Sequence, residues 1–205
     1  MAKQSRLSFK VSQISSNKPF DLIHCDIWGP HRIYSYSGAR YFLTIVDDFS
    51  RYTWVHLMRH KSETQSIIKN FFAWVKTQHN LTIKTLKSNN GQEFLSLQTF
   101  LDENDTIFHR SCPYTPQQNR VEEKKHHHLL NVARAIKFQA SLPLKFLGEH
   151  NKTACYLINR IPSPLLSHKT PYEKLHKKPP PYSHLRVYGC LCFATNLRPS
   201  HKFDT

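Results

Sequence analysis

The fold is decided by three apolar segments, Asp21-Leu-Ile-His-Cys-Asp26-Ile-Trp28, Tyr41-Phe-Leu-Thr-Ile-Val46 and Tyr52-Thr-Trp-Val-His-Leu-Met58. Their β-branched and aromatic residues favour strands, and Gly29-Pro30 and Asp47-Asp48 end the first two. The second and third segments are close enough along the chain to form a hairpin. The sequence therefore predicts that the domain opens with an antiparallel sheet.

Helices and further strands alternate after these segments. Apolar residues recur at helical spacing up to about His79. Strands are expected over residues 82–88 and 106–112, and helices over 92–104, 120–140 and 143–159. Early paired strands followed by interleaved helices predict an α/β domain with a mixed five-stranded sheet flanked by helices.

Both ends of the chain differ from this pattern. Residues 1–18 are polar and are expected to be a flexible tail, residues 19–175 to form the core, and residues 176–205 to be a basic, proline-rich extension. The extension contains one short apolar segment, in which Leu191 and Phe193 flank Cys192. We expect these two residues to lie in a buried strand.

The charge balance points to a polyanionic partner. The chain has 29 Lys and Arg against 14 Asp and Glu, a formal net charge of +15. Such a field attracts nucleic acid, although a basic protein without a specific partner is the alternative. No apolar run approaches the roughly 18 residues of a membrane span, and no secretory signal opens the chain. We expect neither a membrane nor a small molecule as a partner.

The cysteines and histidines do not predict a zinc site. Five cysteines form no Cys-x-x-Cys pair, which favours reduced thiols in an intracellular protein. The run His126-His127-His128 falls in the expected helix over 120–140. Consecutive helical residues point about 100° apart, so these three side chains are not expected to converge on one ion.

Two carboxylates stand out in so basic a chain. Asp26 lies inside an apolar strand, and Glu123 lies in the first turns of the long helix, after a proline-flanked loop. A carboxylate in an apolar strand is costly unless it is paired or binds a cation. Two acids on rigid elements are half of a two-metal phosphoryl-transfer site. The alternative is that Asp26 pairs with a lysine and Glu123 is solvated.

Several motifs, in the same order and at the same spacing, closely resemble the integrase core of copia-type retrotransposons. They are His24-Cys-Asp26-Ile-Trp-Gly-Pro30, Asp47-Asp-Phe-Ser-Arg51, Lys87-Ser-Asn-Asn-Gly91, Ser111-Cys-Pro-Tyr-Thr-Pro-Gln-Gln-Asn119 and Leu157-Ile-Asn-Arg160-Ile-Pro-Ser163. The resemblance implies an RNase H-like fold, Mg²⁺ or Mn²⁺ as cofactor, and DNA as substrate for 3′-end processing and strand transfer. It also implies a nuclear location, and it makes residues 1–18 the remnant of a linker after a zinc module.

The resemblance assigns a catalytic triad with one substitution. Asp26 and Glu123 match the first aspartate and the glutamate, and they are the expected metal ligands. Asn89, in Ser88-Asn89-Asn90-Gly91, stands where the family has its second aspartate. Asn offers one neutral oxygen and an NH₂ donor, whereas hard divalent ions prefer carboxylates. We expect weakened metal binding and impaired strand transfer. Asp47 and Asp48 are interpreted as turn and cap residues.

The loop and long helix supply the candidate DNA contacts. Arg120 replaces a glycine of the family pattern, which puts the loop geometry in doubt. The expected nucleic-acid-binding residues are Arg120, Lys124, Lys125, His127 and Arg134. A solvated helix face is the alternative. A binding-only relic of a degenerate element stays open as a second function, and homodimerisation as a third, weaker one.

Overall fold

The central sheet has five strands in the order β3-β2-β1-β4-β5. A computed structural model of the chain describes residues 16–111 and 120–193. The strands are β1 (Leu22–Trp28), β2 (Tyr41–Asp47), β3 (Thr53–Met58), β4 (Thr85–Ser88) and β5 (Ile107–Arg110). The first three are antiparallel neighbours, while β4 runs parallel to both β1 and β5. The predicted mixed five-stranded sheet is confirmed.

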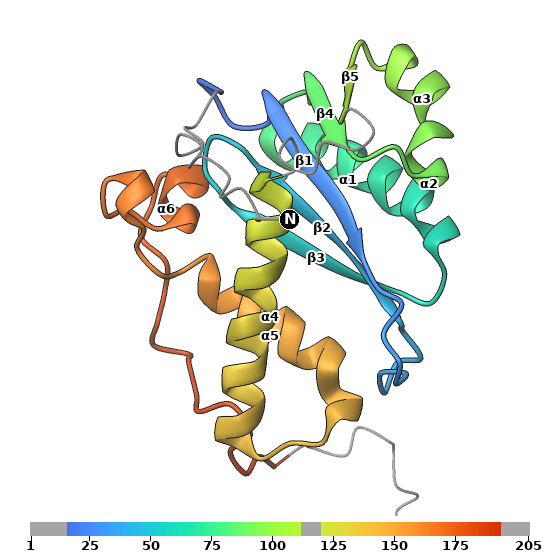
Figure 1. The fold of residues 1–205 in the computed structure, drawn as a ribbon. Helices are drawn as coiled ribbons and strands as arrows, with labels where there is room; N and C mark the ends of the chain where they lie inside the picture. The colour runs from blue at the N-terminus through green and yellow to red at the C-terminus, as the bar shows by residue number, and fades with distance from the viewer. Residues whose placement is uncertain (1–15, 112–119, 194–205) are drawn as a thin grey trace, which may run out of the picture.

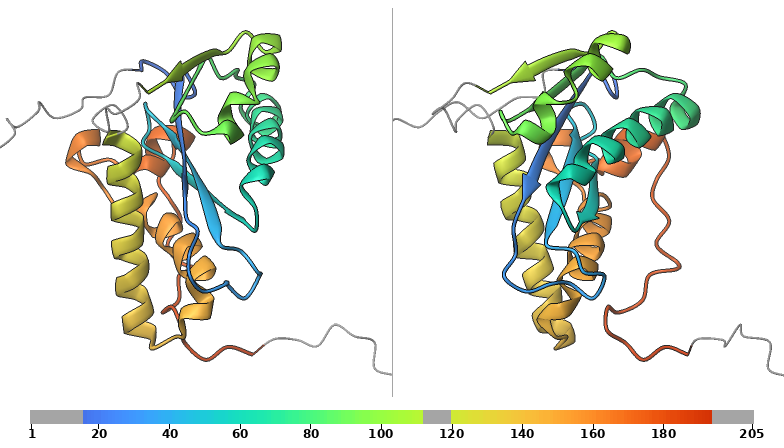
Figure 2. Two further views of the ribbon diagram at one scale, coloured as in Figure 1. Left: turned by 45° about the vertical axis from the view of Figure 1, so that its right-hand side comes forward. Right: turned by 90° about the vertical axis from the view of Figure 1, so that its right-hand side faces the viewer.

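Helices cover both faces of this sheet. They are α1 (Thr64–His79), α2 (Gln92–Leu95), α3 (Gln98–Glu103), α4 (Arg120–Ala140), α5 (Leu147–Ile158) and α6 (Pro171–His176). Figures 1 and 2 show α1 to α3 on one face and the long α4 with α5 on the other. In the described ranges, no helix combines the length and apolar character needed to cross a bilayer.

Each face of the sheet has its own apolar core. On the α1 side, Ile23 and Cys25 of β1 pack with Leu43, Ile68 and Phe94. On the other side, α4 and α5 pack against Phe42 through a second group of buried residues: Leu129, Ala133, Ile136, Ala154, Cys155 and Ile158. Because successive strand residues point to opposite faces, His24 and Asp26 point toward α4.

The outer edge of β3 is bonded by a side chain of the segment after α5. The Asn159 carboxamide accepts a hydrogen bond from the Thr53 backbone N–H (2.9 Å) and donates one to the Thr53 carbonyl (2.7 Å). Asn159 is buried, as is Thr53. The amide therefore takes the place of a neighbouring strand and fixes the end of α5 to the sheet.

Replacing Asn159 with Ala should lower the free energy of unfolding by about 2–3 kcal/mol, because the buried Thr53 N–H loses its acceptor. The measurement is urea unfolding of the Asn159→Ala chain. Asn131 is an exposed asparagine of α4, and Asn131→Ala is the matched control, expected to stay within about 0.5 kcal/mol of the unmodified chain. Equal effects of the two substitutions would contradict a structural role for the Asn159 amide.

The expected buried strand around Leu191 is wrong. The Leu191 side chain is 84% exposed and that of Phe193 is 92% exposed, and residues 177–193 contain no strand or helix. An apolar segment forms a buried strand only where a sheet edge is open to it. The chain just before Leu191 instead contacts the helices, where the Tyr188 hydroxyl lies 2.8 Å from His150 Nδ1 of α5. The expected helix over 92–104 is instead two short helices, α2 and α3.

Candidate functional site

The site is centred on β1, in the middle of the sheet. Asp26 lies opposite Thr44 of β2, and Cys25 lies beside Ser88 of the parallel strand β4. Asn89 is the residue immediately after β4, so the sheet register brings it level with Asp26. Two segments 63 residues apart in sequence are thereby adjacent. The parallel pairing thus produces the juxtaposition of the first two triad positions.

Asn89 donates a hydrogen bond to Asp26. Its Nδ2 lies 3.0 Å from Asp26 Oδ1, and its own Oδ1 accepts the Gly91 backbone N–H at 3.0 Å. The same Asp26 oxygen also accepts the Ile27 N–H at 2.9 Å. If the Asn89 amide were flipped, its oxygen would face the Asp26 carboxylate and its NH₂ group would face the Gly91 N–H. Both contacts would be repulsive, so the amide is assigned with its NH₂ group toward Asp26. A donor therefore faces the carboxylate oxygen where a cation ligand would be required.

His126 of α4 completes the surroundings of Asp26. Its Nδ1 lies 3.4 Å from Asp26 Oδ2, and its Nε2 lies 2.6 Å from the Thr44 hydroxyl. The ring is 7% exposed and meets Phe42 edge-on at 5.5 Å between centroids. The sequence reasoning had not placed His126 among the site residues. The available signal was its position one helical turn after Glu123, on nearly the same face of α4.

Glu123 lies on an exposed turn of α4. Being three residues before His126, it lies near the end of the helix that contacts Asp26. Within residues 16–111 and 120–193, no three His, Cys, Asp or Glu side chains are grouped so as to hold one ion. Because Asn89 presents a donor to Asp26, position 89 does not fit a two-ion centre, which needs anionic oxygens between the ions.

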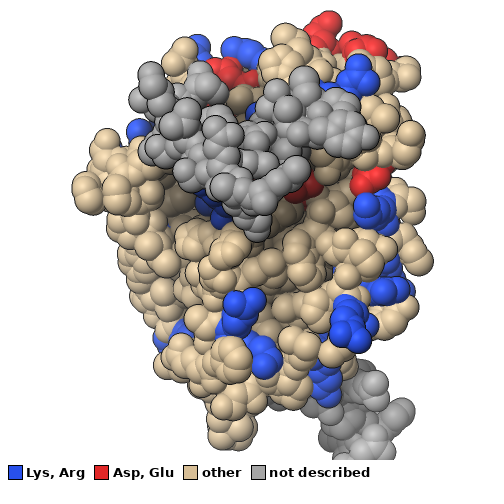
Figure 3. Space-filling model, viewed as in Figure 1, with Lys and Arg blue, Asp and Glu red and all other residues tan. Residues whose placement is uncertain are grey.

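The predicted DNA contacts on α4 divide into two faces. Lys124, His127 and Arg134 are exposed, and their spacing of three and seven residues places them along one stripe of the helix. Arg120 is the first residue of α4, and the structure describes only its backbone. Figure 3 shows Lys and Arg over the lower half of α4, with no described acidic side chain visible there.

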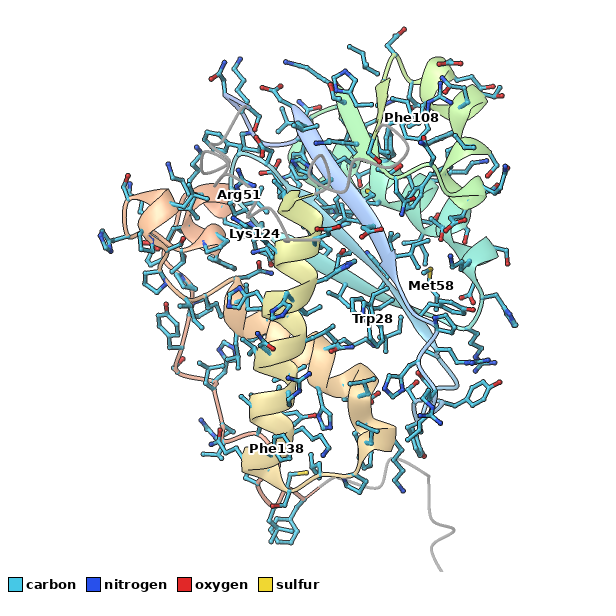
Figure 4. The ribbon with its side chains drawn as sticks, in the orientation of Figure 1. Trp28, Arg51, Met58, Phe108, Lys124 and Phe138 are labelled. Atoms are coloured by element: carbon cyan, nitrogen blue, oxygen red, sulfur yellow. The ribbon has the colours of Figure 1, made fainter. Side chains whose placement is uncertain are left out.

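Lys125 points to the other side of the helix and is only partly exposed. Burial lowers the pKa of its amine to about 8. The nearby Cys155 thiol acts in the opposite direction, and the Arg51 guanidinium lowers the pKa further. Burial likewise raises the pKa of the Cys155 thiol to about 12. Figure 4 shows Arg51 at the same end of α4 as Lys124. Lys125 is therefore a packing residue between α4 and the β2–β3 turn, apart from the exposed stripe.

The Asp47 and Asp48 carboxylates form hydrogen bonds and ion pairs at the β2–β3 turn. Asp47 accepts the backbone N–H of Phe20 at 2.7 Å and of Ser50 at 2.8 Å. Asp48 pairs with Arg51 at 3.1 Å and His24 at 3.2 Å. Asp47 lies three residues along β2 from the partner of Asp26, about 10 Å at strand rise. These contacts agree with the interpretation of both residues as turn and cap residues.

Sequence comparisons identify relatives over nearly the whole chain. Residues 16–116 match the model of the integrase core domain. The chain is 36% identical over 98% of its length to the retrovirus-related Pol polyprotein from transposon RE2 of Arabidopsis thaliana, and 34% identical over 98% to that from transposon RE1. It is 36% identical over 94% to that from transposon TNT 1-94 of Nicotiana tabacum. The chain spans 14–15% of these polyproteins.

Structural comparisons find retroviral integrases. The HTLV-2 integrase catalytic core domain, solved with magnesium in a trimeric form, matches with a TM-score of 0.56 and 18% identity over 78% of this chain and 98% of its own. A chain of the simian T-cell lymphotropic virus intasome with PP2A regulatory subunit B56 gamma matches with a TM-score of 0.61 and 15% identity, over 93% of this chain and 66% of its own. The predicted RNase H-like fold is confirmed.

Proposed function

Because the chain belongs to the integrase core family, with copia-type transposon polyproteins as relatives, we propose that it is a DNA-binding integrase core whose end processing and strand transfer are impaired. The observation that carries the proposal is the hydrogen bond from Asn89 Nδ2 to Asp26 Oδ1. In an active centre that position supplies an anionic oxygen, whereas here it supplies a donor.

Metal binding by this site is weak. Mg²⁺ and Mn²⁺ take carboxylate and water oxygens, and of the three triad positions only Asp26 and Glu123 carry carboxylates. An ion at Asp26 must first displace the Asn89 amide. Two divalent ions carry four positive charges, and two carboxylates offset only two of them. The remaining charge disfavours the binding of two ions side by side. The metal-ligand set that the family uses for catalysis therefore lacks one carboxylate in this chain.

DNA binding is supported by charge. The chain carries a net charge of +15, and Lys124, His127 and Arg134 form an exposed stripe on α4 that leads to the Asp26 site. Contacts of this kind bind the phosphate backbone without reading its sequence. A chromosomal DNA substrate would require a nuclear location. Homodimerisation is compatible with this function and is tested directly by sedimentation.

The experiment is a paired binding and joining assay on one short oligonucleotide duplex with Mn²⁺. We expect the unmodified chain to bind the duplex with an affinity that falls steeply with salt. We expect its strand joining not to exceed that of the Asp26→Asn variant, in which the central carboxylate is neutralised. Joining clearly above that variant would refute the impairment, and failure to bind DNA would refute the function as a whole.

The second candidate is a binding-only relic, in which no joining can be recovered. Arg120, in place of the glycine of the family pattern, favours it because it is a second departure from that pattern besides Asn89. Restoring the carboxylate at position 89 separates the two candidates, since it would recover activity only in a site that is otherwise sound.

A further inference from the structure

A basic recess lies between the β2–β3 turn and the segment around α6. It has a volume of about 290 Å³, and its floor includes the Phe49 ring. Four lysines line it: Lys169, Lys174, Lys177 and Lys178. Two of their ammonium groups lie over the ring, with Lys174 Nζ 5.5 Å and Lys177 Nζ 5.7 Å from its centroid. Two chain segments more than 100 residues apart thus build one cationic surface.

The recess carries more positive than negative charge. Among the residues that the structure describes, no carboxylate lies within 4.0 Å of the four lysine amines. The only acid that lines the recess is Glu173. Its carboxylate accepts the Thr170 backbone N–H at 2.8 Å, which lowers the pKa of Glu173. Glu173 therefore caps α6 and also interacts with the charge of Lys169. One carboxylate against four lysines leaves the recess with a net positive charge for an external anion.

The recess is built on a rigid support. The Tyr172 N–H donates to the Asn159 carbonyl at 2.9 Å, and Leu175 is part of the core on the α1 side of the sheet. Thr170 and Glu173 form a capping box at the start of α6. Clustered lysines normally repel one another, and side chains on a mobile segment would separate to relieve that repulsion. Here the helix that carries Lys174 is held in place by its buried face.

The recess and the Asp26 site are connected through strand β2. Asp26 is opposite Thr44 in the sheet, and Phe49 follows five residues later in the turn after β2. Residues 44–47 run along β2, and Phe49 lies in the turn that follows this strand. Figure 1 shows α6 toward the same end of the molecule as the N-terminal end of α4.

We propose that the Phe49 recess is a second phosphate-binding site, which holds the backbone of the DNA whose other contacts lie along α4. This inference rests on the proposed DNA-binding function and deepens it. Ammonium groups bind phosphates as point charges, and an aromatic floor shields them from water on one side. The ligand class is a phosphodiester chain, bound without regard to base sequence.

The test is fluorescence anisotropy of a labelled duplex with the full chain, at several salt concentrations and without divalent metal. The variant is Lys174→Gln/Lys177→Gln. The matched control is Lys69→Gln/Lys76→Gln, which makes the same charge change at a separate recess that α1 lines with Phe100 of α3. We expect the slope of log K against log salt concentration to fall by about 2 in the variant and by less than about 0.5 in the control.

Equal slopes in the variant and the control would overturn the proposal, because lost charge rather than lost phosphate contacts would explain any weakening. If the unmodified chain binds DNA and the variant binds it equally well, this inference is wrong and the proposed function still stands. No binding by any chain would remove both. A further titration adds inorganic phosphate at constant ionic strength. Phosphate that stabilises the unmodified chain but leaves its DNA affinity unchanged would assign the recess to a free phosphate instead of DNA.

Discussion

Asn89→Asp is expected to raise Mn²⁺-dependent strand joining by about 10²- to 10³-fold over the unmodified chain. That factor corresponds to about 2.7–4 kcal/mol of transition-state stabilisation. The substitution removes the NH₂ group that bonds Asp26 Oδ1 at 3.0 Å and puts a carboxylate oxygen in its place. Both carboxylates would then face the same space, with Glu123 on the adjoining helix. The assay is joining of a short oligonucleotide duplex.

Stability gives a second readout of the same substitution that does not depend on catalysis. Without divalent metal, the Asn89→Asp chain should be less stable than the unmodified chain by about 1–3 kcal/mol, because a hydrogen bond becomes a repulsion between carboxylates. Millimolar Mn²⁺ should restore its melting temperature, since an ion that binds only the folded state stabilises it. The unmodified chain should respond little to the same metal.

The control is Asn90→Asp, which adds the same charge one residue further along. Asn90 Nδ2 donates to the Ser111 carbonyl at 2.8 Å and does not bond Asp26, so this variant should gain no joining activity. Recovery of metal-dependent stabilisation without joining by Asn89→Asp would locate the remaining defect in the loop at Arg120. Neither effect in Asn89→Asp would refute the claim that this amide is what disables the site.

The architecture was predictable because its signals are local. Alternating apolar residues and the Gly29-Pro30 and Asp47-Asp48 stops mark β1 and β2, and the predicted bounds of α4 agree with the structure. The exposed segment at Leu191 and Phe193 was not predictable in this way. Whether an apolar stretch is buried depends on where the preceding chain leads it, and here Tyr188 contacts His150 of α5, 38 residues earlier in the sequence.

The candidate site was predictable in its residues and not in its contacts. Motif spacing identified Asp26, Asn89 and Glu123, but the direction of the Asn89 amide follows from the Gly91 N–H that fixes it. His126 looked like one of three consecutive basic residues, and its burial against Thr44 follows from the rotation of α4 on the sheet. The same rotation turns Lys125 inward. Charge patterns in a sequence do not give this angle.

Asp47→Ala is expected to lower the free energy of unfolding by about 3–5 kcal/mol. The Asp47 carboxylate is fully buried and accepts hydrogen bonds from Phe20 N–H, Ser50 N–H and the Ser50 hydroxyl. Burial raises its pKa, while these donors act in the opposite direction. Removing the carboxylate leaves three buried donors without an acceptor, two of them backbone groups that cannot turn toward solvent.

Urea unfolding of three variants tests this expectation. Asp47→Asn should cost less than Asp47→Ala, because its amide oxygen still accepts one donor while its NH₂ group opposes another. Asp102→Ala removes an exposed carboxylate of α3 that accepts only the Gln98 amide among the described contacts, and it should change stability by less than about 0.5 kcal/mol. A loss for Asp47→Ala no larger than that of Asp102→Ala would mean that the turn does not depend on this carboxylate.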